Sequence, residues 1–175
     1  MQIVFIRHSM TAGNLERRYI GCRTDEPLCE AGISLAQQKT AEIRQTFPMP
    51  EVVLTSPMRR CVQTAEILFP DTPREIVYGL QECDFGDFEG KNYAELSGDP
   101  AYQAWIDSGG QMMVPNGESG AGFRHRCCRA YEQCVRDAQE KGAQRIAIVC
   151  HGGTIMSVLE LSLIHISEPT RLDVI

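Results

Sequence analysis

Two short apolar runs, each ending in basic side chains, most constrain the fold of this chain. Residues 3–6 precede Arg7 and His8, and residues 146–150 precede His151. Runs of this length that are rich in β-branched residues are typical of strands buried on both faces. Ligands of open α/β sheets bind beyond the carboxyl ends of the strands. The sequence therefore predicts that these basic residues gather at one edge of a sheet.

The chain between the two runs alternates strand signals with helical ones, which predicts an α/β fold. We expect a three-layer α/β/α sandwich with a mostly parallel sheet. A stretch rich in Gly, Asp and Pro over about 83–118 predicts an excursion over the sheet, in the manner of a lid. The predicted elements are strands near 3–6, 51–55, 76–78 and 145–149, and helices over about 32–46, 58–68, 119–141 (capped by Ser119) and from Gly153 onward.

Composition and charge exclude several classes of protein. The 175 residues suffice for one domain with a sizeable core, and the 43% hydrophobic content is ordinary for a globular protein. The net charge of −6 argues against nucleic acid and anionic membranes as partners, so an anion site must be a local basic pocket. No apolar run approaches the roughly 20 residues that cross a bilayer, and the first strand signal starts beside Met1. We therefore expect a cytoplasmic protein, whose oligomeric state leaves no readable mark.

The eight cysteines are scattered along the chain and form no CxxC pair. The sequence also lacks the HxH and HExxH patterns that supply metal ligands at suitable spacing. In a reducing compartment such cysteines are free thiols. We therefore expect neither a metal nor a cofactor.

The basic residues at the predicted strand ends suit a phosphoryl group. His8, as a neutral imidazole, can act as the nucleophile and form a phosphohistidine. The guanidinium groups of Arg7 and Arg60 match the oxygens of phosphate. His151 can donate a further hydrogen bond, best as an imidazolium. Each residue alone is more often a structural or solvated group, but together they point to an anion site.

Two further features complete this candidate site. Gly152 and Gly153 leave room for a close approach of backbone and ligand at the start of a helix. Glu82 is a candidate general acid. That role requires its pKa to be raised by burial or by neighbouring negative charge.

Five segments carry a family resemblance: IRHSMTAGNLERRYIGCRTDEPLCEAG, LTSPMRRCVQTAEIL, LQECDFGDFEG, PNGES and IVCHGG. In that order they resemble the motifs of the histidine phosphatase superfamily, branch 1, also called phosphoglycerate mutase-like. The resemblance covers roughly residues 1–160 and implies chemistry that needs no metal. It implies that His8 is the phosphorylated nucleophile, that Arg7, Arg60 and His151 complete the phosphate pocket, and that Glu82 is the proton donor. It also implies substrate-binding candidates, which are Asn14, Arg17, Tyr19, Gly21, Arg23, Thr24 and Gly152.

Two departures from the family pattern stand out. Ser9 occupies a position where the family has glycine, so a positive φ there would cost strain. The segment 161–175 resembles no family terminus and looks like translated adapter or vector sequence. We therefore predict a histidine phosphatase domain over 1–160 that is truncated at its C-terminus, and a non-native tail over 161–175. The sheet is then expected to lack its C-terminal edge element.

The resemblance implies a phosphatase that transfers the phosphoryl group of a small phosphorylated metabolite to His8 and then to water. The first segment looks nearest to phosphatases of the α-ribazole phosphate type. One alternative is a cofactor-dependent phosphoglycerate mutase, which the short chain and the compact 83–118 stretch disfavour. Ser9 and the atypical end motivate another alternative, a non-catalytic protein that binds a phosphorylated ligand.

Overall fold

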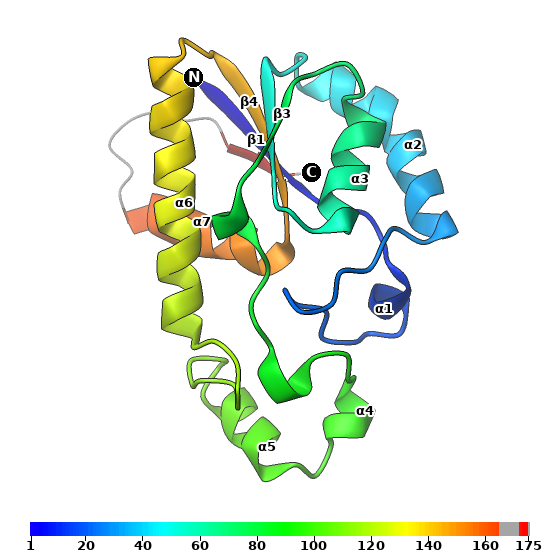
Figure 1. The fold of residues 1–175 in the computed structure, drawn as a ribbon, viewed down its shortest axis with the longest axis vertical. Coiled ribbons are helices and arrows are strands. Elements are labelled where there is room, and N and C mark those ends of the chain that lie inside the picture. The colour runs from blue at the N-terminus through cyan, green and yellow to red at the C-terminus, as the bar shows by residue number, and fades with distance from the viewer. Residues whose placement is uncertain (165–171, 175) are drawn as a thin grey trace.

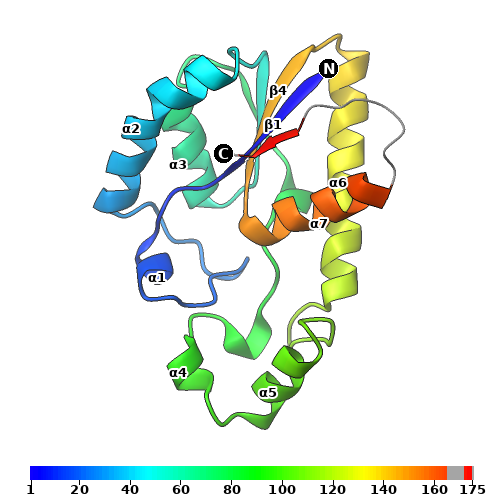
Figure 2. The same ribbon diagram turned by 180° about the vertical axis from the view of Figure 1, so that it is seen from behind.

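The computed structural model describes residues 1–164 and 172–174. Its strands form one sheet in the order β3-β2-β4-β1-β5, and every neighbouring pair is parallel (Figures 1 and 2). The predicted α/β fold with a parallel sheet between helices is confirmed. The strands are β1 (Gln2–Arg7), β2 (Val52–Thr55), β3 (Arg74–Ile76), β4 (Arg145–Cys150) and β5 (Leu172–Val174).

Helices cover both faces of the sheet. The predicted cap of the longest helix is present, because the Ser119 side chain accepts a hydrogen bond from the Gly122 N–H. The helices are α1 (Ala12–Leu15), α2 (Glu30–Thr46), α3 (Arg59–Leu68), α4 (Tyr93–Leu96), α5 (Pro100–Asp107), α6 (Gly120–Glu140) and α7 (Gly152–Ile164), with 3₁₀ turns η1 (Tyr78–Leu80) and η2 (Gly86–Phe88).

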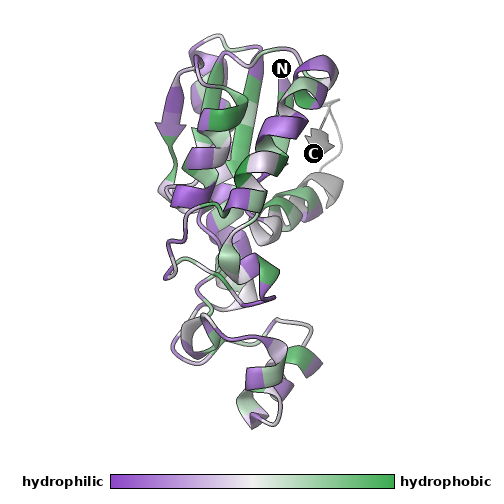
Figure 3. Cartoon of the chain, turned by 90° about the vertical axis from the view of Figure 1, so that its right-hand side faces the viewer, coloured by the Kyte–Doolittle hydropathy of each residue, from purple (hydrophilic) through white to green (hydrophobic). Residues whose placement is uncertain are grey.

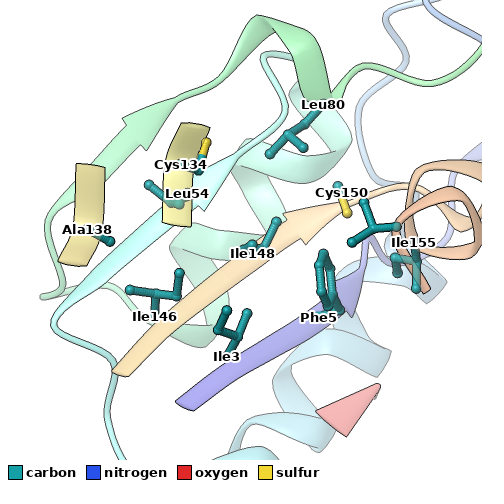
Figure 4. Close-up of a cluster of buried hydrophobic side chains, with 11 residues drawn as sticks. Ile3, Phe5, Leu54, Leu80, Cys134, Ala138, Ile146, Ile148, Cys150 and Ile155 are labelled. Atoms are coloured by element: carbon teal, nitrogen blue, oxygen red, sulfur yellow. The ribbon is translucent and has the colours of Figure 1, made fainter. Parts of the chain in front are cut away.

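Alternation along the central strands creates the two helical layers. Ile3 and Phe5 of β1 belong to the core cluster that α6 and α7 cover, and Figure 4 shows them beside Ile148 of β4. Val4 and Ile6 belong to the opposite cluster, which α2 and α3 cover. Because successive side chains of a strand point to opposite faces, each apolar run is buried on both sides. Figure 3 shows the central strands as largely hydrophobic bands between helices of mixed character.

Residues 84–118 form a cap that lies beyond the carboxyl edge of the sheet rather than over its face (Figures 1 and 3). The cap contains η2, α4 and α5 and has a small core of its own. Asp99 accepts hydrogen bonds from the first backbone N–H groups of α5, and Pro100 opens that helix. The members of the core are Phe88, Leu96, Tyr102 and Val114, with Tyr19, Phe85 and Trp105 packed against them.

The sheet edges differ from the sequence expectations. The strand expected near 76–78 is β3 at Arg74–Ile76, whose residues are all exposed, so burial leaves no apolar signal there. The C-terminal edge element that we expected to be missing is present as β5, which pairs with Ile3–Phe5. Three residues are too few for a period-two pattern to stand out. The remainder of the predicted tail, 165–171 and 175, lies outside the described residues.

Candidate functional site

His8 directly follows β1, at the carboxyl edge of the sheet. Its Nδ1 lies 2.7 Å from the Ser9 carbonyl oxygen, and its backbone N–H donates to the Cys150 carbonyl at 3.0 Å. Since Nδ1 donates to a carbonyl, Nε2 carries the lone pair. Burial, with the nearby charges of Arg60 and Arg7, lowers the pKa of His8 to about 4 against the opposing effect of the Ser9 hydrogen bond. The ring is therefore neutral near pH 7, as a nucleophile must be.

Arg60 is fully buried in the first turn of α3. Its Nη1 donates to the Thr24 carbonyl at 2.8 Å and its Nη2 to the Gly21 carbonyl at 3.0 Å. Its Nε has no hydrogen-bond partner, and no carboxylate among the described residues forms an ion pair with the guanidinium. A buried cation without a counter-ion is costly. Arg60 therefore marks a place where an anion would be stabilised.

His151 follows β4 and lies beside His8, with ring centroids 5.1 Å apart. Its Nε2 is 2.8 Å from the hydroxyl of Ser56, which follows β2. Burial lowers the pKa of His151 well below 6.5, and the charge of Arg60 acts in the same direction. The lowered pKa favours the neutral ring, which can still donate a hydrogen bond through its single N–H. Sequence reasoning missed Ser56, although being next to a strand end was a usable signal.

Glu82 lies against the start of α7. One carboxylate oxygen accepts the Cys83 N–H at 3.0 Å and the other accepts the Gly153 N–H at 3.2 Å. Burial raises the pKa of Glu82, although these two backbone hydrogen bonds oppose the shift. A Cβ at position 153 would stand 2.5 Å from the Glu82 Oε1 atom. The room that we expected Gly153 to leave for a ligand is therefore occupied by Glu82.

Arg7, the last residue of β1, is exposed and lies against Gly152, the first residue of α7. A Cβ at position 152 would stand 3.6 Å from the Arg7 Nε atom, an ordinary contact distance. The arginine thus reaches the helix start that follows His151. The structure brings Arg7, His8, Arg60, Glu82 and His151 to the carboxyl edge of the sheet.

Gly21 and Thr24 were predicted to contact substrate, but in the structure they hold Arg60. Their carbonyls accept from the Arg60 guanidinium, and their backbone N–H groups donate to the Glu89 Oε1 atom at 2.8 and 3.0 Å. Glu89 therefore fixes the loop that fixes Arg60. Sequence reasoning gave this carboxylate no role, although it lies within the family-like segment LQECDFGDFEG.

Asn14 and Tyr19 form hydrogen bonds within the protein that limit how they can bind a ligand. The amide oxygen of Asn14 accepts the Thr11 N–H at 3.1 Å, so the donor end of its side chain is the part suited to phosphate oxygens. The Tyr19 hydroxyl lies 2.8 Å from that of Tyr102. Tyr19 thus belongs to the aromatic core of the cap.

Among the described residues, no hydrogen bond or ion pair joins Arg17 or Arg23 to the residues of the His8 cluster. Arg17 is exposed just after α1 and has a φ of 55°. Arg23 forms an ion pair with Asp84 at 2.7 Å and donates to the Asn116 carbonyl. Its charge is therefore used to join the first loop to the cap.

Ser9 causes no backbone strain, because it is not among the residues with positive φ. Its hydroxyl donates to the Gly32 carbonyl at 2.7 Å, and its N–H donates to the Thr64 hydroxyl at 3.0 Å. The side chain thus faces α2, and the Ser9 carbonyl remains available to His8. The strain that would follow from a positive φ does not arise.

Three further observations concern other classes of site. In the part of the chain that the structure describes, no three His, Cys, Asp or Glu side chains are grouped to hold a metal ion. All eight cysteines are unpaired. Within the same residues, no helix has both the length and the apolarity to span a bilayer.

Comparisons with known proteins identify the family of the chain. The family model "Histidine phosphatase superfamily (branch 1)" matches residues 3–174. Adenosylcobalamin/alpha-ribazole phosphatase of Escherichia coli (strain K12) is 30% identical over 168 residues, which are 94% of this chain and 79% of that protein. 2,3-Bisphosphoglycerate-dependent phosphoglycerate mutase 2 of Gloeobacter violaceus is 30% identical over 173 residues, covering 94% and 76%. The crystal structure of the alpha-ribazole phosphatase from Shigella flexneri superposes with a TM-score of 0.76 at 26% identity, covering 95% and 80%.

Proposed function

Because the chain belongs to branch 1 of the histidine phosphatase superfamily, we propose that it hydrolyses a small phosphomonoester through a phosphohistidine at His8. One observation carries the proposal. The neutral imidazole of His8 lies in the field of Arg60, a buried cation without a carboxylate partner among the described residues. A nucleophile beside an uncompensated cation suits a dianionic phosphoryl group.

The first step transfers the phosphoryl group to the protein. Nε2 of His8 attacks phosphorus, the P–N bond forms, and the bond from phosphorus to the leaving oxygen breaks. Arg7, Arg60 and the N–H of His151 bind the non-bridging oxygens as their charge is redistributed. Glu82, whose pKa is raised by burial, gives its proton to the leaving oxygen.

The second step returns the protein to its starting state. A water molecule attacks phosphorus, and the Glu82 carboxylate accepts its proton. The P–N bond breaks, inorganic phosphate leaves, and His8 is neutral again. Every proton and electron pair is supplied by the side chains named, the ester and water, so the proposal includes no metal and no cofactor.

The proposed partner is a small phosphorylated metabolite met in the cytoplasm, and α-ribazole phosphate is the first candidate because of the relatives named above. A phosphoglycerate mutase is the alternative, since a mutase is equally similar in sequence. It would use the same phosphohistidine but return the phosphoryl group to a bound product. Release of inorganic phosphate separates the two.

The test is phosphate release from a panel of esters in the presence of EDTA. The panel contains p-nitrophenyl phosphate, α-ribazole phosphate, sugar phosphates and 3-phosphoglycerate, the last also with 2,3-bisphosphoglycerate. The variants are His8→Ala and, as a matched control, His125→Ala, which removes an exposed histidine of α6. We expect EDTA-resistant release that is lost in His8→Ala and unchanged in His125→Ala.

Three other outcomes would contradict the proposal. Activity that survives in His8→Ala would exclude the phosphohistidine. Conversion of 3-phosphoglycerate without net phosphate release would establish the mutase. A folded protein that binds phosphate but releases none from any ester would establish the non-catalytic alternative.

A further inference from the structure

A cavity of about 240 Å³ adjoins the proposed phosphate site. Glu82 and Gly153 line it on the side of the sheet, so the candidate proton donor borders this space. Its outer wall comes from the cap and the start of α6, through Phe85, Trp105, Glu118 and Phe123. When Glu82 gives its proton to the leaving oxygen of an ester, the rest of the leaving group therefore lies next to this cavity.

On the side of the cap, the cavity is lined by aromatic rings that pack against other rings. Phe85 and Trp105 meet edge to face, with ring centroids 6.4 Å apart. Tyr19 packs against both rings at 5.2 and 5.7 Å, and its hydroxyl is held by Tyr102. Rings fixed in this way offer faces and edges to another ring at little cost in side-chain entropy.

The lining of the cavity offers no unpaired positive charge. The lining residues include two carboxylates, Glu82 and Glu118, and no Lys, Arg or His. Arg126 is bound by both Glu118 oxygens, at 2.8 and 3.1 Å, and also donates to the backbone carbonyls of Gly79 and Gln81. A carboxylate brought into this space would find no unpaired cation among the lining residues, and it would oppose the negative charge that Glu82 gains on giving up its proton.

Building on the phosphatase function proposed above, we propose that this cavity receives the leaving group and selects uncharged aromatic or heteroaromatic alcohols over carboxylate-bearing ones. Trp105 and Phe85 supply the contact for the ring. Glu118 keeps Arg126 from acting as a carboxylate receptor. The preferred substrate class is a phosphomonoester whose alcohol carries an uncharged ring.

The test compares three primary alkyl phosphates with similar leaving oxygens: 2-phenylethyl phosphate, propyl phosphate and 3-(phosphonooxy)propanoate. We expect kcat/KM to fall in that order. In Trp105→Leu, kcat/KM for the phenylethyl ester should fall by about threefold to tenfold while the propyl value stays unchanged. The matched control is Ile106→Ala, the exposed neighbour in α5, which should leave all three values unchanged.

A second variant keeps the test decisive if Trp105→Leu disturbs the cap. Glu118→Gln removes the negative charge that pairs with Arg126, so kcat/KM for the carboxylate ester should rise by about tenfold. The inference alone is overturned if the wild type cleaves the three esters equally, or if both substitutions leave their ratios unchanged. If His8-dependent release is absent for all three esters, the phosphatase function fails and this inference fails with it.

Discussion

Two adjacent glycines at the start of α7 allow the general-acid assignment to be tested with a single methyl group. A Cβ at position 153 would stand 2.5 Å from the Glu82 Oε1 atom and 3.1 Å from the Phe123 ring. A Cβ at position 152 would meet nothing closer than 3.6 Å. Neither glycine has a positive φ, and alanine favours helix formation more than glycine does. Both Gly→Ala variants should therefore fold.

The expected effect follows from how far the carboxylate must move. Ordinary contact begins at 3.4 Å, so in Gly153→Ala the Glu82 oxygen must retreat by about 0.9 Å. A misplacement of about 1 Å in a catalytic group costs about 10²-fold in rate. We therefore expect kcat/KM for an alkyl phosphate to fall about 10²-fold, or about 2.7 kcal/mol in the activation free energy. Gly152→Ala should stay within about threefold of wild type.

The assay compares an alkyl phosphate with p-nitrophenyl phosphate for both variants. The nitrophenolate departs with little help from a proton, so Gly153→Ala should lose far less activity on that ester. Equal losses on the two esters would refute the argument, because the methyl group would then be disturbing phosphate binding. Equal losses in Gly152→Ala and Gly153→Ala would refute it as well, since only position 153 faces Glu82.

Three further predictions concern the pH profile, the buried cation and the serine. Because burial raises the pKa of Glu82, kcat/KM for alkyl phosphates should rise with pH as His8 loses its proton near pH 4 and should fall at higher pH as Glu82 ionises. In Glu82→Gln the falling limb should vanish from the pH–rate profile of kcat/KM. Arg60→Lys should lower kcat/KM by about 10²-fold in steady-state assays, because one ammonium cannot donate to the Gly21 and Thr24 carbonyls and bind phosphate at once. Wild-type kinetics in this variant would contradict the role of Arg60. Ser9→Ala should lower the free energy of unfolding by about 1 kcal/mol in urea titrations and leave kcat within about twofold, whereas a large loss of kcat would show that the hydroxyl positions His8.

The sequence alone was sufficient to predict the site residues that lie at strand ends. His8 and His151 follow strands whose apolar runs are long enough to recognise, and parallel strands bring such residues to one edge of the sheet. The edge strands were predicted less well. The strand expected near 76–78 lies at Arg74–Ile76, where every residue is exposed, and β5, which spans only three residues, was not predicted. Arg23 shows a different limit. A long side chain in a loop is directed by its partner, here Asp84, and that partner is 61 residues away in the chain.

The residues that hold others in place were the hardest to find, for a physical reason. Ser56 holds His151 from 95 residues away, Glu89 holds Gly21 from 68, and Gly153 holds Glu82 from 71. A reacting group must be a particular chemical type, so its identity survives in the sequence as a motif. A residue that only positions another needs a hydrogen-bond donor, a hydrogen-bond acceptor or the absence of a bulky side chain at the right place. Many residue types meet one of these needs. Substitutions at such positions therefore tune the geometry around His8 and Glu82 without removing either group. We expect differences in leaving-group preference among similar chains to arise there and in the cap.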